Sequence, residues 1–341
     1  MRKYIRIGVD IAKNSFQVHA LVSEDCSATK RKLSRSGIVK YLADVEPCAI
    51  GMEACGSAHY WARQFRAMGH EVKLTPPIYV KAYVKRGKND AADAEAICEA
   101  AQRPTMRFVV PKSAEAQAAA VVFRTRDLLV RQRTQLINAL RGHLAEFGFV
   151  VPQGAGHVNK LITLVEDPAS DMPIAARTIL SVLSQTFQTI QLKITVLDRE
   201  IAARAKADAT IRRLMTIPGV GPVVATAIVA LAPAASTFRR GRDFAAWLGL
   251  TPRQHSSGGK ERLGRVTRMG ERSLRRLLIL GASSVTKVAA RHPTRGGVWL
   301  AGMLFRKPRM LVTVALANKI ARTVWALMAH GGSYRAPAVA V

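Results

Sequence analysis

The sequence predicts an α/β N-terminal domain, a long helical region with coiled-coil spacing and a mainly helical C-terminal domain. Three observations lead to this prediction. Apolar–polar alternations interleave with helical patterns over residues 1–110, and two long amphipathic stretches lie within 111–208. Helical patterns interrupted by Gly and Pro fill 209–330, and residues 331–341 have the composition of a flexible tail.

Alternating apolar and polar residues predict strands at the start of the chain. The segments with this pattern are KYIRIGV and SFQVHALV, and ATKRKLSR could supply a third strand. A helix is predicted over 36–45, followed by the buried strand CAIGMEA, a helix in SAHYWARQFRAMG that ends at Gly69, and the strand EVKLTP. Three early antiparallel strands followed by strand–helix units give an α/β layer fold.

Two long helices with coiled-coil seams are predicted in the middle of the chain. Their seam residues are Val122, Leu129, Leu136, Leu140, Leu144 and Phe147 in the first helix, and Leu183, Phe187, Ile190, Ile194, Leu197 and Ile201 in the second. The loop FVVPQGAGH and a less regular segment separate them. The spacing is equally compatible with packing inside one chain and with pairing between two chains.

The charge balance indicates a polyanionic partner. The chain has 52 Lys and Arg residues against 23 Asp and Glu, a formal net charge of +29 at pH 7. The span 239–309 alone holds 17 basic residues against Asp243, Glu261 and Glu271. Such an excess repels itself in a compact state, so nucleic acid is the favoured partner, with an arginine-rich surface as the alternative.

The remaining composition indicates a cytoplasmic protein. The four cysteines, Cys26, Cys48, Cys55 and Cys98, lack metal-ligand spacing and are predicted to be reduced. The N-terminus lacks the apolar core of a signal peptide. No apolar stretch of about 18 residues is free of charge, so no membrane-spanning helix and no membrane partner are expected.

Four carboxylates in the first domain are candidate metal ligands. Asp10 and Glu53 each end an apolar strand, where an isolated carboxylate is costly unless a cation or proton neutralises it. Asp90 and Asp93 are three residues apart at the start of a helix and therefore share one face. Helix capping is the alternative explanation for the second pair, but it does not account for the first.

Two motifs in the C-terminal domain are candidate DNA contacts. TIPGVGPVVATAIVALAP has the spacing of a helix-hairpin-helix, in which Gly219 and Gly221 allow a tight turn whose amides can face a phosphate. A plain helix–helix connector is the alternative. The neighbouring basic residues favour a sequence-independent DNA contact.

The second motif is the loop TPRQHSSGGKERLG. By pattern alone, Ser256 and Ser257 are ordinary turn residues. Five basic residues crowd the loop and could screen a scissile phosphate: Arg253, Lys260, Arg262, Arg265 and Arg268. A hydroxyl at a glycine turn can also approach a DNA backbone closely, as a covalent nucleophile must.

These motifs together resemble a known family. VDIAK, GMEACG and KNDAADA are similar to the RuvC-like, RNase H-fold N-terminal domain of DEDD-type insertion-sequence transposases, which are described as bridge-RNA-guided (seekRNA) recombinases. FAAWLGLTPRQHSSGGKERLG and MGERSLRRLLI resemble the C-terminal transposase domain of the same family. The two resemblances cover about residues 5–100 and 212–285.

The resemblance implies roles for particular residues. Asp10, Glu53, Asp90 and Asp93 would hold Mg²⁺, and Ser257 matches the position of the essential serine, with Ser256 as the neighbour to exclude. Lys13 and Lys88 match positions that are commonly basic. His255 is a possible acid or base that we leave outside the catalytic set.

The function implied is that of a DNA recombinase that moves its own insertion sequence. A guide RNA would pair with donor and target DNA, and a phosphoserine intermediate would conserve the bond energy. Composite sites formed between protomers imply a dimer or tetramer, acting at the bacterial nucleoid. The alternatives are a metal-dependent nuclease or junction resolvase without a serine nucleophile, and a non-enzymatic basic DNA-binding protein.

Overall fold

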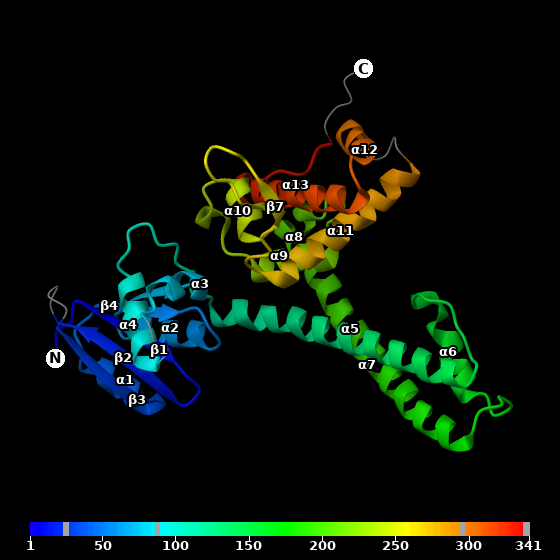
Figure 1. Cartoon of the computed structure of the whole chain (residues 1–341), viewed down its shortest axis with the longest axis horizontal. Coiled ribbons are helices and arrows are strands. Elements are labelled where there is room, and N and C mark those ends of the chain that lie inside the picture. Colours follow the sequence, from blue (N-terminus) through cyan, green and yellow to red (C-terminus); the bar gives the residue numbers. More distant parts are fainter. Residues whose placement is uncertain (23–26, 86–88, 293–296, 337–341) are drawn as a thin grey trace. The chain divides into compact units, whose positions relative to one another are not determined.

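The chain folds into two units, Met1–Gln117 and Ala118–Val341 (Figure 1). A computed structural model describes residues 1–22, 27–85, 89–292 and 297–336. The boundary between the units falls in the first turn of helix α5, Ala114–Glu146.

The first unit is built on a five-stranded sheet in the order β3-β2-β1-β4-β5. Its strands are β1 Arg6–Ile11, β2 Ser15–Leu21, β3 Ala28–Ser34, β4 Ala49–Glu53 and β5 Glu71–Thr75. The first three strands are antiparallel neighbours, whereas β4 runs parallel to β1 and β5 parallel to β4. This confirms the predicted mixed α/β character of the N-terminal region.

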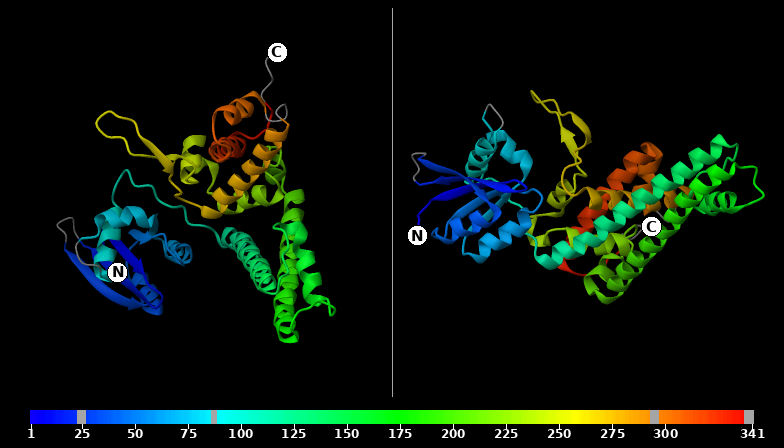
Figure 2. Two further views of the ribbon diagram at one scale, coloured as in Figure 1. Left: turned by 45° about the vertical axis from the view of Figure 1, so that its right-hand side comes forward. Right: turned by 90° about the horizontal axis from the view of Figure 1, so that it is seen from below.

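Helices cover both faces of this sheet (Figure 2). The helices of the unit are α1 Arg35–Ala43, α2 Ala58–Ala67, α3 Pro77–Val80 and α4 Asp90–Ala100. On one face, Val9 and Met52 join Ile38 of α1 and Phe65 of α2 in the core. The opposite face of β1, β2 and β4 packs against α4.

Two long helices, α5 and α7 (Ile174–Ala207), open the second unit, with α6 (Val158–Glu166) between them. Arg126 Nε of α5 lies 2.5 Å from Asp198 Oδ1 of α7, and Arg133 Nη1 donates to Gln191 Oε1 at 2.9 Å. The two helices therefore run antiparallel and contact each other inside the chain. Phe147, a predicted seam residue, instead lies beyond the end of α5 and is exposed.

Further helices form the core of the rest of this unit. They are α8 Ala209–Leu214, α9 Pro222–Leu231, α10 Gly241–Trp247, α11 Arg272–Arg291, α12 Gly297–Arg306 and α13 Arg309–His330. Helix α13 is the one described helix that is long and apolar enough to cross a membrane by length and composition. Its apolar face fills the core, because Val312, Ala317, Ala321 and Val324 are fully buried.

Two features of this unit differ from the sequence-based expectation. A two-stranded hairpin, β6 Pro252–Gln254 and β7 Leu263–Val266, replaces the irregular loop expected between α10 and α11. Tyr334, in the predicted tail, packs against the core, and its amide donates to Thr216 Oγ1 at 2.9 Å.

Candidate active site

Asp10 and Glu53 lie side by side at the ends of two parallel strands. The register pairs Gly8 with Gly51 and Val9 with Met52, and the next residues along the two strands are Asp10 and Glu53. Because side chains alternate between the faces of a sheet, both carboxylates share the face of Gly8 and Gly51. This is the face that α4 covers.

The two glycines allow α4 to approach this face closely. A Cβ atom on Gly8 would lie 2.2 Å from the carbonyl oxygen of Ala94, and one on Gly51 would lie 2.7 Å from the Cβ of Ala101. Any larger side chain at either position would push the helix away. The glycines of the motifs GVD and GME thus bring the first turn of α4 to the end of β1.

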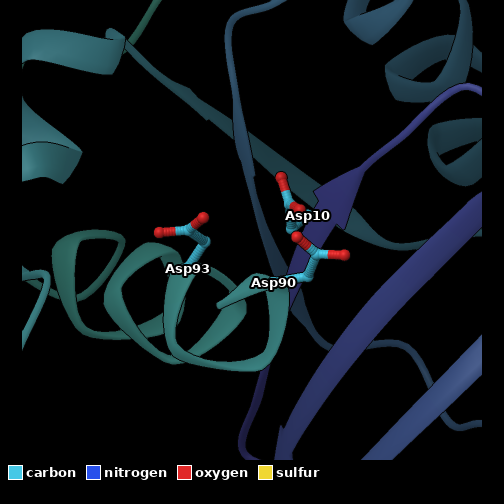
Figure 3. A group of neighbouring side chains, drawn as sticks. All are labelled: Asp10, Asp90 and Asp93. Atoms are coloured by element: carbon cyan, nitrogen blue, oxygen red, sulfur yellow. The ribbon is translucent and has the colours of Figure 1, made fainter. Parts of the chain in front are cut away.

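The first turn of α4 supplies two further carboxylates. Asn89 is its N-cap, and its side chain accepts a hydrogen bond from the amide of Ala92 at 2.7 Å. Asp90 and Asp93 are therefore not the caps of this helix. One carboxylate oxygen from each of Asp10, Asp90 and Asp93 lies within 4.8 Å of the others, and Figure 3 shows the three side chains gathered between the strand and the helix.

The electrostatics of this cluster disfavour a full set of bare negative charges. Burial, with the carboxylates of Asp93 and Asp90, raises the pKa of Asp10 above its ordinary 3.8. Burial, with Asp10 and Asp93, likewise raises the pKa of Glu53 above 4.5. Among the described residues, none of the four acids forms an ion pair with Lys or Arg.

A hard divalent cation fits this donor set. Carboxylate oxygens are the preferred ligands of Mg²⁺, and ligands of one such ion lie roughly 3–4 Å apart when its bonds are about 2.1 Å long. The separations among Asp10, Asp90 and Asp93 are compatible with that geometry. Glu53 is outside the group of three, although the register of β1 and β4 places it beside Asp10.

Sequence reasoning missed two polar neighbours of the acids. Thr75 is paired with Glu53 in the sheet, is fully buried, and its hydroxyl has no hydrogen-bond partner among the described residues. Gln17 is paired with Asp10 on the other side of β1. The predicted hairpin could have placed Gln17, but Thr75 required the register of two strands that are distant in sequence.

The structure describes one of the two lysines predicted to contact nucleic acid. Lys13 is exposed in the turn after β1, and its carbonyl oxygen accepts a hydrogen bond from Arg35 Nη1 at 3.0 Å. Lys88 lies outside the described residues.

Ser257 lies at the tip of the β6–β7 hairpin in the second unit. It forms a bridge with Lys260, whose amide donates to the Ser257 carbonyl at 3.1 Å. The central residues of the turn, Gly258 and Gly259, have φ of +57° and +76°, as a type I′ turn requires. The whole tip is exposed.

The two adjacent serines differ in their hydrogen bonding. Ser256 Oγ accepts from the amide of Arg262 at 3.1 Å and thereby ties the two arms of the hairpin together. The Ser257 hydroxyl has no hydrogen bond within the described part of the chain. His255 joins the opposite arm through its amide, which donates to the Arg262 carbonyl at 2.8 Å, and its ring lies over Gly264.

All five predicted basic residues around the serine are exposed on or beside this hairpin. They are Arg253, Lys260, Arg262, Arg265 and Arg268. Arg268 has a left-handed backbone with φ of +56°, which is strained for a residue with a side chain. The hairpin thus presents a hydroxyl among cations that could contact phosphate.

A buried arginine, which sequence reasoning missed, holds the base of the hairpin. Arg275 of α11 is only 9% exposed, and its Nη1 donates to the carbonyl oxygens of Leu248 at 3.0 Å and Met269 at 2.5 Å. Gly270 makes room there, because a Cβ on it would overlap the Trp247 carbonyl at 1.7 Å. The exposed arm therefore extends from a fixed base.

The predicted helix-hairpin-helix segment folds as α8, a tight turn and α9. Gly219 has φ of +87° in the turn, and Gly221 precedes Pro222 at the start of α9. The turn packs on α11, because a Cβ on Gly219 would lie 2.9 Å from the Gly281 carbonyl oxygen. Gly219 thus supports packing as well as the turn, whereas a Cβ on Gly221 would meet no atom within 4 Å.

Comparison with known proteins points to one family for both units. Residues 7–149 match a DEDD-type IS110 family described as a transposase, and residues 211–295 match the Transposase IS116/IS110/IS902 family. The chain is 46% identical to a probable family 20 transposase of Pseudomonas aeruginosa, over 97% of this chain and 98% of the relative. It is 37% identical to the transposase for insertion sequence element IS1328 of Yersinia enterocolitica, over 95% and 97%, and 37% identical to that for IS1111A of Coxiella burnetii, over 96% and 91%.

Proposed function

The chain belongs to the IS116/IS110/IS902 transposase family, and we propose that it recombines DNA through a covalent bond to Ser257 beside a divalent metal. The observation that carries the metal half is the gathering of Asp10, Asp90 and Asp93 within 4.8 Å. The strand order β3-β2-β1-β4-β5 supports the RuvC-like, RNase H-type interpretation of the first unit.

Asp10, Glu53, Asp90 and Asp93 would hold the metal, with Mg²⁺ as the preferred ion. When bound, it would stabilise the charge that develops on the attacking and leaving oxygens of a phosphodiester. Glu53, beside the group of three, completes the donor set from β4. The buried Thr75 hydroxyl is in register to support the Glu53 carboxylate.

The Ser257 hydroxyl is the proposed nucleophile. Its oxygen attacks the phosphorus of one strand, the bond from phosphorus to a sugar oxygen breaks, and the serine proton passes to that departing oxygen. The hydroxyl of another strand then attacks the phosphoserine and releases Ser257. The bond energy is conserved in this exchange, so no nucleotide cofactor is needed.

Electrostatics supports contacts with the DNA backbone. The five basic residues around the hairpin would contact phosphates, as would Lys13 and Lys88. The α8–α9 turn with Gly219 and Gly221 would add a sequence-independent contact. Base pairing with a guide RNA would then supply sequence specificity for donor and target DNA.

The acids and the serine lie in different units of the chain. We therefore propose a composite site in which protomers of a dimer or tetramer contribute different parts. The DNA substrate makes the cytoplasm, at the nucleoid, the proposed place of the reaction.

Strand exchange by single variants tests this function. Ser257→Ala should abolish exchange and covalent trapping on nicked DNA, whereas Ser256→Ala should retain measurable exchange. Asp10→Asn should abolish exchange while keeping DNA binding. Full cleavage by Ser257→Ala would support a water-using nuclease, and normal function of Asp10→Asn and Glu53→Gln would support a DNA-binding protein.

The guide requires a separate test. Nuclease-treated protein should lose recombination, and added RNA transcribed from the flank of the element should restore it. Recombination by RNA-free protein would contradict RNA guidance without touching the serine proposal.

A further inference from the structure

An aromatic side chain projects into solvent where α12 meets α13. Phe305, in the last turn of α12, is 92% exposed, the highest value among the large apolar residues of the described chain. Val298, seven residues earlier on the same helix, is 75% exposed. Burying a phenylalanine side chain normally stabilises a folded protein by roughly 1.5–3 kcal/mol, and the exposed Phe305 ring does not make this contribution.

The exposed ring is followed in the sequence by a run of basic residues. Arg306, Lys307 and Arg309 follow Phe305 directly, and all three are exposed. Arg306 Nε donates to the carbonyl oxygen of Gly302 at 3.1 Å, which holds its guanidinium at the end of α12. From Arg272 to the C-terminus the chain has twelve Lys and Arg residues and no Asp or Glu.

This charge pattern identifies the kind of partner. A second copy of the chain packing symmetrically on this surface would oppose cation to cation, which disfavours self-association here. A partner must instead combine negative charge with flat apolar faces. Unpaired nucleotides have both, because each base has a π face and each linkage has a phosphate.

We propose that the α12–α13 junction binds an unpaired segment of RNA, with one base stacked on Phe305 and flanking phosphates held by Arg306, Lys307 and Arg309. Duplex DNA does not offer such a base, because its bases are stacked on each other. A guide RNA, by contrast, offers unpaired loops throughout the reaction. This inference rests on the proposed function, and it adds a specific site to the general positive charge of the C-terminal region.

Fluorescence anisotropy with full-length, nuclease-treated protein tests the proposal. The probes are an unstructured 20-nucleotide RNA of mixed sequence, the single-stranded DNA of the same sequence, and the two corresponding duplexes. Phe305→Ala should weaken binding of single-stranded RNA roughly 5- to 150-fold, the range for loss of one stacked base. Phe305→Trp should restore it, and duplex binding should change less than about 2-fold.

Two further measurements make the assignment direct. Phe147→Ala, which removes an exposed phenyl ring after α5, is the matched control and should leave RNA binding unchanged. Irradiation of 5-iodouridine-labelled RNA should cross-link Phe305, as identified by peptide mass spectrometry.

Several results would overturn the proposal. They are wild-type RNA affinity in Phe305→Ala, tighter binding of single-stranded DNA than of RNA at this site, and a changed subunit number in Phe305→Ala, which would indicate a protein interface. If the wild-type protein bound no RNA at all, the proposal of RNA guidance would itself be wrong. Wild-type RNA binding that is insensitive to Phe305 would overturn only this site.

Discussion

The half-buried carboxyl of Asp10 combines two costs, burial at the end of a central strand and repulsion by Asp93 and Asp90. Glu53 experiences the same two effects from the neighbouring strand. A divalent cation bound among these carboxylates would stabilise the folded protein, because its positive charge would offset their mutual repulsion. The free energy of unfolding should therefore depend on both the pH and the binding of a divalent metal at these acids.

The pH dependence of stability has a definite sign. The folded-state pKa values of Asp10 and Glu53 are raised, so ionisation is harder in the folded than in the unfolded chain. Their contribution to the free energy of unfolding is retained at low pH and lost as pH rises from the ordinary values of 3.8 and 4.5 through the raised ones. Metal-free Asp10→Asn should therefore lose less stability than wild type as the pH rises above the ordinary Asp pKa of 3.8, as measured by thermal unfolding.

Asp44→Asn is the control, since Asp44 is an exposed acid outside the cluster. Adding Mn²⁺ at about 100 times its Kd should stabilise the wild type by roughly 2.7 kcal/mol and Asp10→Asn by much less. If the stability of wild type and Asp10→Asn depended equally on pH and rose equally with Mn²⁺, the proposal that Asp10 belongs to a metal-binding acidic cluster would be wrong.

At the scale of elements, the placement of α4 depends on two residues that have no side chain. Gly8 and Gly51 let the helix rest on β1 and β4, and only this close packing brings Asp90 and Asp93 to Asp10. The acidic cluster is thus a consequence of helix–sheet packing.

Substituting Gly8 tests this dependence. Gly8→Ala should destabilise the protein by about 1–3 kcal/mol and weaken Mn²⁺ binding, because the new Cβ overlaps the Ala94 carbonyl. Calorimetry and Mn²⁺ titration measure both effects. Gly56→Ala is the matched control and should behave like wild type, since a Cβ there would meet no atom within 4 Å.

The serine hairpin depends in the same way on a buried side chain. Arg275→Met would leave the carbonyl oxygens of Leu248 and Met269 without their donor, at a cost of about 1–3 kcal/mol. Amide hydrogen exchange should increase over residues 249–270, and the rate of strand cleavage should fall while DNA affinity stays near wild type. Amide hydrogen exchange rates unchanged from wild type would show that Arg275 does not hold the base of the hairpin.

The sequence predicted the first sheet better than the second. Alternation in β1 and β2 and the buried run in β4 reflect burial on one or both faces, which a pattern can reveal. The β6–β7 strands are short and almost fully exposed, so no apolar alternation marks them. Their one local signal was Gly258-Gly259, a dipeptide suited to a hairpin turn.

The site was predicted unevenly for a related reason. Asp10 and Glu53 stood out because a carboxylate after an apolar run is unusual, and Asp90 and Asp93 because their spacing places both on one face of a helix start. Arg275 and Thr75 did not, because their surroundings are created by segments distant in sequence. The choice of Ser257 over Ser256 came from family resemblance and stays a prediction; the structure adds that Ser256 Oγ accepts a hydrogen bond from the Arg262 amide.

At the scale of the whole molecule, the proposed reaction requires both units, and the proposed oligomer allows them to come from different copies. Mixed protomers test this. Asp10→Asn and Ser257→Ala proteins, each inactive alone, should regain part of the strand-exchange activity when coassembled with different affinity tags. No recovery in verified mixed oligomers would show that one protomer must supply the whole site.

The most direct test of the account is the chemical identity of the bond between protein and DNA. A suicide substrate with a nick near the cleavage point, incubated with protein, guide RNA and Mg²⁺, should leave a denaturation-resistant adduct. Digestion and mass spectrometry should locate the attached nucleotide on Ser257, with no adduct in Ser257→Ala or Asp10→Asn. Cleaved DNA with no protein attached, or a nucleotide attached to any other side chain, would contradict the proposed covalent bond between Ser257 and DNA.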